Sequence, residues 1–496
     1  MGRVLDIKMK NGSAKMGRTA VTVLRPPGKT GVSQALSYAY EHRAAFVRAL
    51  MDFIRFPSVS ANNSGAVRKC AEWLAGHLNH IGMKRVSITP TKRHPIVYAE
   101  YPGSPGQATV LFYGHYDVQP AGGHEAWQTP PFEPVVRGDN LYGRGASDDK
   151  GQLFTHIAAI ESYLRSSGKL PVNVKCIFEG EEEIGSPSLG PFLTNNRALL
   201  LADMAVVSDT SMPGPDTPAI TFSLRGALGI DLEVSGPAHD VHSGTFGGAV
   251  PNPFHVLCEM IACLHDKKGR IAIPGFYDSV RARGRQVRDY MARTGPSDET
   301  ILKDAGARAG WGEPGYTLYE RTTLRPALSV TRITSGTDTA QETAAIPSIA
   351  RASLDFRLVP DQAPHKIARI VHDYVQDITP HTVRATIRTR IAAKPAVISP
   401  AHPGLKAAAG AYRLGFGKEP LFLLSGGTIP VVRMFKDILG IETVLMGFAL
   451  FDDGKHGPNE KLYLPNFFNG ISTSIHFLSQ IGQRRGEKRE RGLNGH

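Results

Sequence analysis

The sequence has little cysteine and no long apolar stretch. Four cysteines, Cys70, Cys176, Cys258 and Cys263, are scattered without a C-x-x-C pair, so reduced thiols are the simplest interpretation. No window approaches the roughly 18 apolar residues of a membrane span. The N-terminal region has basic residues but no apolar stretch of signal-peptide length. We therefore expect a cytoplasmic protein with no membrane partner.

The formal charge of +12 is concentrated at the two ends. Residues 1–31 hold seven Lys or Arg and one Asp, and residues 483–496 hold five basic and two acidic residues. These segments therefore account for nine of the twelve excess charges, and the body needs no polyanionic partner such as nucleic acid. We interpret both segments as solvated, frayed tails. Anion or surface binding by the tails is the alternative.

The length and composition indicate a globular protein of two domains. The chain has 496 residues, of which 41% are hydrophobic and 21% charged, and two domains is the natural expectation at this length. Nearly continuous apolar segments, TVLFYG, VNVKCIF and MAVVSD, alternate with helical patterns. This alternation predicts an α/β domain with a mixed, mostly parallel sheet covered by helices.

The pattern changes after Pro218 and returns to α/β near Pro395. Between them, alternating strand patterns flank two helical ones, which predicts a small α+β domain inserted into the first. The catalytic domain would then be discontinuous. The expected division is a basic tail (1–31), catalytic domain (32–218 and 395–482), inserted lid or dimerisation domain (219–394) and a second basic tail (483–496).

Side chains of the kinds that bind metals lie beside the predicted strands and helices. TVLFYG leads into His115 and Asp117, VNVKCIF into Glu181–Glu183, and MAVVS into Asp209, while Asp148 precedes a predicted helix at Gly151. In open α/β sheets, functional sites gather at the carboxyl ends of strands. Four separate loops could therefore deliver one imidazole and several carboxylates to a single crevice.

Such a cluster of carboxylates would be strongly repulsive without cations. Two divalent ions would resolve this, and imidazole with carboxylate ligands suits Zn²⁺, with Mn²⁺ or Co²⁺ as substitutes. His456, in the polar loop GKHGPNE, could supply a second imidazole. Taken singly, Asp209 and Asp148 could be turn or helix-cap residues, His456 a surface histidine, and the glutamates a solvated turn. The conjunction of all of them favours the metal site.

Five motifs in this order resemble those of a known family. They are GHYDVQP, GRGASDDKG, FEGEEEIGS, VVSDT and HGPNE. The set is similar to the di-zinc aminopeptidase-like hydrolases, which include carnosinase, cytosolic non-specific dipeptidase, carboxypeptidase G-type enzymes, acetylornithine deacetylase and succinyl-diaminopimelate desuccinylase. The likeness covers roughly residues 35–480 and is closest to the carnosinase-like dipeptidases.

The resemblance implies a role for each acid and histidine. His115 and Asp209 would bind one metal, Glu183 and His456 the other, and Asp148 would bridge both. Asp117 would orient the His115 ring by accepting its other N–H. The resemblance also implies a cis peptide bond between Asp148 and Asp149.

The resemblance also separates the three consecutive glutamates. Glu182 would be the general base and Glu183 a metal ligand, while Glu181 would be a solvated bystander. In SGPAHDVHSG, His242 matches a family histidine that donates to the tetrahedral oxyanion in the active site of the neighbouring subunit. The protein is therefore expected to be a homodimer through its inserted domain.

The expected substrate is a small peptide or an N-acyl-amino acid. Arg357, in SLDFRLVP, resembles the family's arginine for a substrate carboxylate, whose two oxygens its guanidinium can hold. Gly426, Gly427 and Thr428, in SGGTIPVV, resemble a substrate-binding loop, although Ser425 stands where the carnosinase branch usually has Glu. We expect a metal-dependent hydrolase of dipeptides with a free C-terminal carboxylate. An N-acyl-amino-acid deacylase is one alternative, and an inactive binding protein is another.

Overall fold

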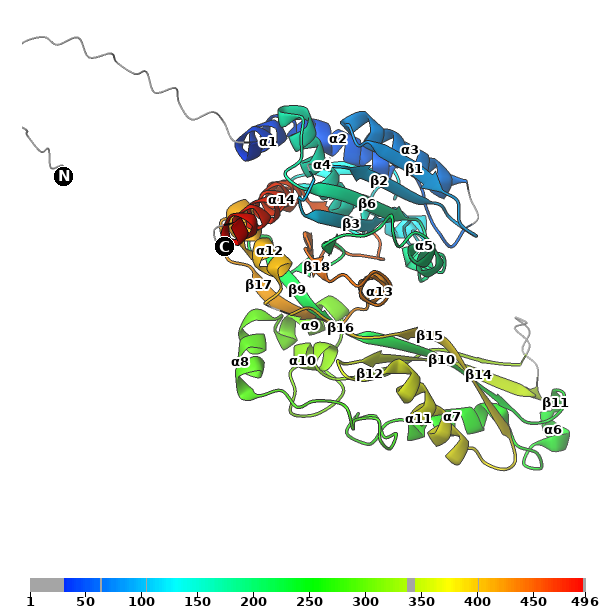
Figure 1. Ribbon diagram of the computed structural model, residues 1–496. Helices are drawn as coiled ribbons and strands as arrows, with labels where there is room; N and C mark the ends of the chain where they lie inside the picture. Colours follow the sequence, from blue (N-terminus) through cyan, green and yellow to red (C-terminus); the bar gives the residue numbers. More distant parts are fainter. Residues whose placement is uncertain (1–30, 63–64, 104, 337–343, 400, 494–496) are drawn as a thin grey trace, which may run out of the picture.

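The protein folds into two bodies joined near the middle of the molecule (Figure 1). The computed structural model describes residues 31–493 except 63–64, 104, 337–343 and 400. The larger body contains both the first part of the described chain and the last, and the smaller one is built from the segment between them. This arrangement confirms an α/β fold with an inserted α+β region.

A nine-stranded sheet forms the centre of the larger body. Its order is β1 (Arg85–Thr89), β2 (Ile96–Tyr101), β6 (Asn173–Glu179), β3 (Thr109–His115), β7 (Met204–Val207), β18 (Thr443–Leu445), β9 (Ala219–Leu224) and β16 (Ala396–Val397), with β17 (Leu421–Ser425) beside β9. Strands β6, β3, β7 and β18 are mutually parallel. The strands at both sides pair antiparallel, apart from β17. The sheet is therefore mixed with a parallel centre, as predicted.

Helices cover this sheet and complete one continuous hydrophobic core. They are α1 (Gly31–Glu41), α2 (Arg43–Ile54), α3 (Ala66–Ile81), α4 (Lys150–Ser167), α5 (Leu189–Asn195), α12 (Pro403–Phe416), α13 (Pro430–Met434) and α14 (Leu464–Leu493). Helix α3 buries the stripe of apolar residues that its helical spacing predicts. It ends where Gly82 adopts φ 104°, a left-handed conformation that glycine tolerates without a steric cost.

Short strands add two small sheets to the larger body. One pairs β8 (Ser211–Met212) with β19 (Ala449–Leu450), and the other joins β4 (Val135–Arg137), β5 (Asn140–Tyr142) and β20 (Lys461–Tyr463). Both sheets connect residues from distant parts of the sequence. They therefore fix the C-terminal loop 451–460 against the first part of the chain.

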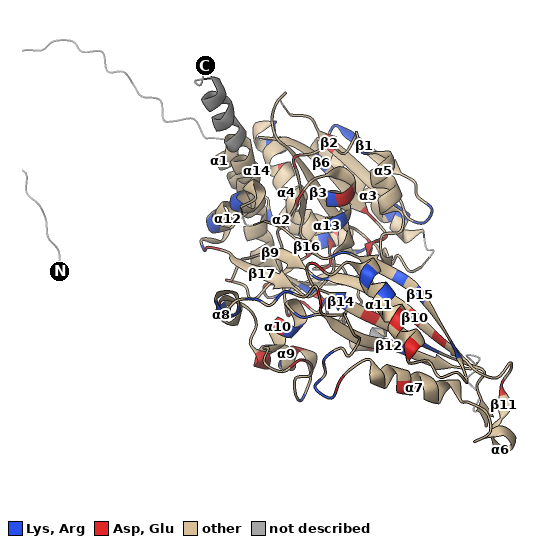
Figure 2. Ribbon diagram, turned by 60° about the horizontal axis from the view of Figure 1, so that its bottom comes forward, with Lys and Arg blue, Asp and Glu red and all other residues tan. Residues whose placement is uncertain are grey.

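The smaller body is a four-stranded antiparallel sheet with helices on one face. The strand order is β12 (Ala327–Ser335), β14 (Ile349–Leu358), β10 (Gly226–Ser235) and β15 (Arg384–Ala393), and the helices are α7 (Pro253–Cys263) and α11 (Pro364–Asp377). Alternate residues of β10 and β14 are buried against these helices in a second core. Acidic and basic residues are interspersed along the strands (Figure 2), and on the face away from the helices they form ion pairs such as Arg390–Asp231 and Arg351–Glu233.

Two further parts of the inserted region matter for the site. The pair β11 (Val241–His242) and β13 (Ala345–Ile346), with α6 (Ser243–Phe246), lies at the outer tip of the smaller body (Figures 1 and 2). Helices α8 (Arg285–Thr294), α9 (Asp298–Ala305) and α10 (Leu318–Thr323) lie at the junction instead. The Tyr319 hydroxyl donates to Leu424 O at 2.9 Å, which ties α10 to strand β17.

The domain boundaries at residues 219 and 395 remain our proposal. Strand β9 (Ala219–Leu224) is hydrogen-bonded within the larger sheet, and β10 begins at Gly226 in the smaller one. This favours Arg225 as the first crossing point. Of the basic tails, residues 1–30 lie outside the described part of the chain, and the backbone of residues 483–493 continues helix α14. No helix of the described chain is both long and apolar enough to cross a membrane.

Candidate active site

Four loops of the larger body meet at the carboxyl edge of the parallel strands. His115 ends β3, the short helix Glu182–Ile184 follows β6, and Asp209 lies just after β7. Because β3, β6 and β7 are parallel, these residues leave the sheet at the same edge. Asp148 comes to this edge immediately before α4.

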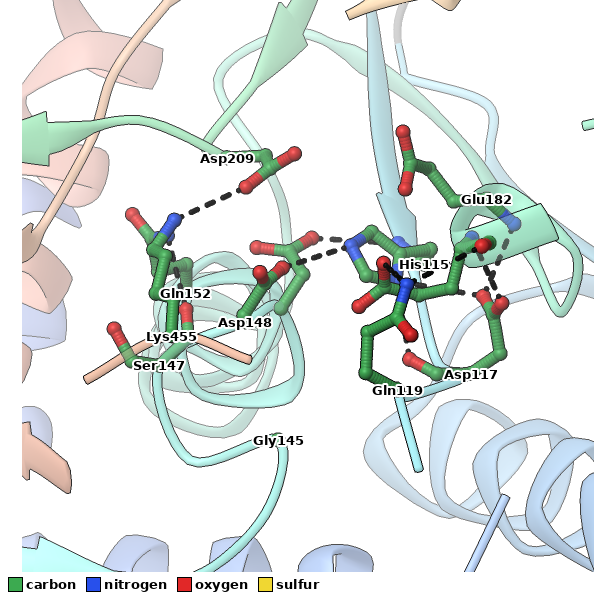
Figure 3. Close-up of polar contacts among 12 residues, drawn as sticks. His115, Asp117, Gln119, Gly145, Ser147, Asp148, Gln152, Glu182, Asp209 and Lys455 are labelled. Carbon is green, nitrogen blue, oxygen red and sulfur yellow. Dashed lines mark hydrogen bonds and ion pairs between the residues drawn. The ribbon is translucent and has the colours of Figure 1, made fainter. Parts of the chain in front are cut away.

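The predicted metal ligands lie in two groups that share one residue. His115, Asp148 and Asp209 form one group, and Asp148, Glu183 and His456 form the other, with the ligand atoms of each group within 4.8 Å of one another. Asp148 Oδ1 is 3.2 Å from His115 Nε2, and Asp148 Oδ2 is 3.0 Å from His456 Nε2. Figure 3 shows Asp148 between Asp209 and Lys455 on one side and His115 on the other. The structure thus brings all five residues together, and their metal-binding roles stay a prediction.

The chemistry of these side chains fits divalent cations. Glu183 Oε1 is buried and has no hydrogen-bond partner among the described residues, which leaves an acceptor for a cation. Asp148 and Glu183 raise the pKa of His456 to about 10 through hydrogen bonds to its ring. The cluster therefore strongly favours positive charge beside its carboxylates. Two imidazoles and three carboxylates are a donor set suited to zinc.

Asp117 holds both His115 and the glutamate loop. His115 Nδ1 donates to the main-chain oxygen of Asp117 at 3.1 Å, and the Asp117 carboxylate lies 3.4 Å from the same nitrogen. Burial lowers the pKa of His115, but the Asp117 and Asp148 carboxylates outweigh this and raise it well above its ordinary value. The Asp117 carboxylate also accepts from the backbone N–H groups of Glu182 and Glu183, at 3.2 and 3.1 Å. One buried acid thus orients a histidine and two glutamates.

The Asp148 loop depends on a residue that the sequence reasoning missed. Glu460 is fully buried and accepts from the backbone N–H groups of Gly145, Ser147 and Asp148, each at 2.9 Å. Its carboxylate also pairs with Arg144 at 2.8 Å. Glu460 is the last residue of the motif HGPNE, so the motif itself was the available signal. The Asp148–Asp149 peptide bond is cis, as the resemblance implied.

The prediction that Glu181 is a solvated bystander is wrong. Glu181 is 1% exposed, and its carboxylate accepts from Thr91 Oγ1 and His94 N at 2.8 Å and from Ser188 N and Oγ at 3.0 Å. Its partners at 91–94 are about 90 residues away in sequence, so no local pattern indicates them. Glu181 therefore anchors the loop that carries Glu182 and Glu183.

Replacing Glu181 with Gln should loosen this loop. An amide nitrogen would face hydrogen-bond donors, and each lost charge-assisted hydrogen bond is worth about 1.5–3 kcal/mol. We expect a lower melting temperature and roughly tenfold weaker metal binding at the Glu183 group, measured by competition with a chelator. Glu72→Gln, on the exposed face of α3, is the control that should leave both unchanged. Metal affinity equal to that of the unmodified protein would refute the anchoring role.

Glu182 differs from its neighbours because its carboxylate is left free. No group of the described chain donates a hydrogen bond to this carboxylate, while its backbone N–H is fixed by Asp117. Burial raises the pKa of Glu182 well above its ordinary value, and the nearby Asp209 and Glu183 carboxylates add to this rise. A free carboxyl with a raised pKa beside a metal group can accept and return a proton.

Arg357 and the 425–428 loop form a second cluster at the junction of the two bodies. Arg357 Nη1 donates to Thr428 Oγ1 at 2.9 Å, and Thr428 Oγ1 donates to the main-chain oxygen of Arg225 at 2.8 Å. Gly426 is required here because a Cβ would come within 2.4 Å of Thr322 O. Gly427 has more room, since a Cβ there would only touch Ser425 Oγ at 3.4 Å.

His242 is the one predicted catalytic residue that the chain does not bring to the cluster. It lies in β11, at the tip of the smaller body and away from the carboxyl edge of the large sheet (Figures 1 and 2). Its Nδ1 accepts from Gly244 N at 3.1 Å. Within one chain, His242 is therefore separate from the metal groups.

Two polar residues beside the metal groups were not predicted. Lys455 Nζ lies 3.2 Å from Asp209 Oδ1, and Gln119 Nε2 donates to Glu183 Oε2 at 2.9 Å. Both are labelled in Figure 3. Gln119 belongs to GHYDVQP and Lys455 directly precedes His456, so adjacency to a motif was the only signal.

Comparison with known proteins places these motifs in context. A family model described as peptidase family M20/M25/M40 matches residues 111–480. The chain is 31% identical to the Cys-Gly metallodipeptidase dug1 of Schizosaccharomyces pombe, over 88% of this chain and 96% of that protein. It is 30% identical to the human Beta-Ala-His dipeptidase, over 91% and 93%. The structure of the M20 family metallo-carboxypeptidase Sso-CP2 from Sulfolobus solfataricus is similar with a TM-score of 0.79 and 30% identity, covering 88% of this chain and 99% of that one.

Proposed function

The chain belongs to peptidase family M20/M25/M40, and from this premise we propose that it hydrolyses dipeptides with a free C-terminal carboxylate. Membership confirms the resemblance inferred from the motifs, and the chain is a metallopeptidase of this family. Similar proteins are named as dipeptidases acting on Cys-Gly and Beta-Ala-His. These names support dipeptides as the substrate class.

We propose that the two groups of ligands each hold one divalent cation. His115 and Asp209 would serve one ion, Glu183 and His456 the other, and the two oxygens of Asp148 would face both. Zn²⁺ is the preferred ion for this donor set, with Mn²⁺ or Co²⁺ as substitutes. When bound, such ions polarise a carbonyl and lower the pKa of water towards neutrality.

We propose that Glu182 moves the proton during hydrolysis. Its free carboxylate would accept a proton from the attacking water and then pass it to the leaving amine. Asp117 would keep Glu182 in place through the backbone N–H and keep His115 oriented through the ring nitrogen. Because Glu182 is held in one position, the same carboxylate would act first as the base and then as the acid.

We propose that Arg357 binds the C-terminal carboxylate of the substrate. Its guanidinium can hold both carboxylate oxygens, and the hydrogen bond to Thr428 positions it beside the 425–428 loop. Gly426, Gly427 and Thr428 would line this point, where the Gly427 N–H donates to Ser425 Oγ and the Thr428 hydroxyl to the main-chain oxygen of Arg225. If the substrate carboxylate is bound at this point, the amide bond of the substrate would extend towards the metal groups.

We propose a cytoplasmic homodimer, without a nucleic-acid or membrane partner. The tip position of His242 supports a dimer, because this histidine could reach an oxyanion only in another subunit. A strictly monomeric mass in solution at full activity would contradict this arrangement. The mixed charges on the smaller body (Figure 2) agree with the absence of a polyanion site.

The observation that carries the proposed function is the sharing of Asp148 by two groups of ligands. An N-acyl-amino-acid deacylase on the same scaffold is the second candidate. The deacylase is favoured by Ser425, because this residue has no carboxylate and stands where the carnosinase branch usually has Glu. The substrate's amino group distinguishes the two functions.

A hydrolysis panel tests the proposal. Dipeptides and their N-acetylated forms are incubated with protein loaded with Zn²⁺ or Mn²⁺, and with protein treated with a chelator. We expect cleavage of free dipeptides, a large loss of rate on N-acetylation, and abolition by the chelator with recovery on adding metal. Cleavage of only the acetylated forms would support the deacylase, and full activity after exhaustive metal removal would overturn both.

A further inference from the structure

A large cavity opens beside the first ligand group, at the junction of the two bodies. It has a volume of about 540 Å³ and is lined by residues of the larger sheet, α9, α10 and the loop before His456. Asp209 and Lys455 lie at one end, Ser425 and Gly426 form part of the wall, and Ile301 and Asp304 of α9 face it from the inserted region. The cavity therefore begins where a reacting carbonyl is expected.

The position of this cavity identifies the half of the substrate that it would take. In the proposed function, Arg357 holds the C-terminal carboxylate beside Thr428. Neither Arg357 nor Thr428 is among the described residues that line the cavity, whereas Asp209 of the first ligand group is. With the amide bond at the metal groups, the residue that supplies the carbonyl would lie in the cavity. Its side chain would contact the lining residues.

Lys455 is the only lysine or arginine among the described residues that line this cavity. Its ammonium lies 3.2 Å from Asp209 Oδ1, and the side chain is 24% exposed. An ammonium has three donors, and the bond to Asp209 occupies one. A cation bound by Asp209 would engage that carboxylate, and Lys455 would then add its positive charge to the same end of the cavity.

Asp209 is the acid of the cavity lining that pairs with Lys455, and a cation bound by Asp209 would offset its negative charge. Ser425 is neutral, and its hydroxyl accepts from Gly427 N at 3.1 Å. Asp304 is exposed on α9, on the side that belongs to the inserted region. With cations at the two ligand groups, the end nearest the reacting carbonyl would therefore be the positive end.

We propose that the cavity selects substrates whose acyl half carries a carboxylate, with Lys455 as its counter-ion. The substrate class is dipeptides with Asp or Glu as the first residue. This inference rests on the proposed function and adds a specificity-determining residue to it. A substrate carboxylate at this point would accept hydrogen bonds from the N–H groups of Lys455 that Asp209 does not use, whereas an uncharged or basic side chain would offer Lys455 no negative charge.

Four compounds in which the amino group of leucine is acylated test the inference by changing one charge at a time. Asp-Leu has an amine and a side-chain carboxylate, Asn-Leu replaces the carboxylate by an amide, succinyl-Leu removes only the amine, and butyryl-Leu has neither charge. We expect kcat/KM for Asp-Leu to exceed that for Asn-Leu at least about tenfold, the size of one charge-assisted hydrogen bond. Any hydrolysis of succinyl-Leu should exceed that of butyryl-Leu by a similar factor.

Variants of Lys455 show whether this residue is responsible. Lys455→Met should bring the ratio of Asp-Leu to Asn-Leu close to one, and Lys455→Arg should restore it. Lys169→Met, an exposed residue just before β6 at the opposite edge of the sheet, should leave the ratio unchanged. Metal content is measured for each variant, because Lys455 contacts Asp209.

A binding measurement gives a readout that does not depend on turnover. Glu182→Gln protein is titrated with succinyl-Leu and butyryl-Leu by calorimetry, with and without Lys455→Met. We expect at least about tenfold tighter binding of succinyl-Leu, and loss of this difference with Lys455→Met. This experiment also decides the matter if Lys455→Met protein is inactive.

The failures of the two proposals are distinguishable. If metal-loaded protein hydrolyses none of the four amides and no other dipeptide, the proposed function fails. If dipeptides are hydrolysed but Asn-Leu is used at least as well as Asp-Leu, only the inference about the cavity is overturned. A ratio that Lys455→Met leaves unchanged would assign the preference to another residue and overturn the role of Lys455.

Discussion

Replacing Glu182 with Gln should lower kcat by roughly 10²–10⁴-fold while the protein keeps its metal content. Glutamine has nearly the same shape but cannot accept a proton at neutral pH. The Glu182 carboxylate receives no hydrogen bond from the described chain, and Asp117 holds the backbone N–H of this residue. The substitution therefore removes the proton acceptor and leaves the packing intact. Steady-state kinetics and elemental analysis of the same preparation measure both quantities.

Replacing the next residue, Glu183, with Gln is the matched control. Glu183 Oε2 lies 3.3 Å from His456 Nε2, so Glu183→Gln should lose metal from this group as well as activity. The two variants thus separate base from ligand. A Glu182→Gln protein that retains its turnover would show that another group accepts the proton, and one that loses metal would show that Glu182 is itself a ligand.

The positions of the site residues could be predicted from the sequence because they follow the ends of apolar strands, which is a local pattern. Apolar strands end in His115 and Asp117, in the glutamates and near Asp209, and parallel strands bring such ends to one edge. The roles within the cluster needed the family resemblance. Nothing in the spacing of Glu181, Glu182 and Glu183 tells which one is free, buried or beside a histidine.

The features that were missed depend on contacts between distant segments. Glu181 is buried because Thr91 and His94 fold over it. The periodicity of hydrophobic residues along the sequence does not indicate such a contact. Lys455 resembles any exposed loop lysine until Asp209, about 250 residues earlier, lies beside it. The pairing of β9 with β17 and β18 is likewise decided by strands far along the chain.

Replacing Asp148 with Asn should abolish activity by removing both cations at once. Its Oδ1 faces His115 and its Oδ2 faces His456, at 3.2 and 3.0 Å. An amide can present only one oxygen and carries no charge, so neither group of ligands would be complete. We expect kcat/KM to fall at least about a thousandfold, which corresponds to roughly 4 kcal/mol. Metal per chain, measured by elemental analysis after gel filtration, should fall from near two towards zero.

Asp209→Asn is the comparison that makes the Asp148 result specific. Asp209 belongs to the His115 group alone, so this variant should keep one metal ion, held by Asp148, Glu183 and His456. A carboxylate that serves both groups must have a greater effect on metal content than one that serves a single group. Equal metal loss in the two variants would contradict the shared role of Asp148, and so would one ion per chain in the unmodified, fully active protein.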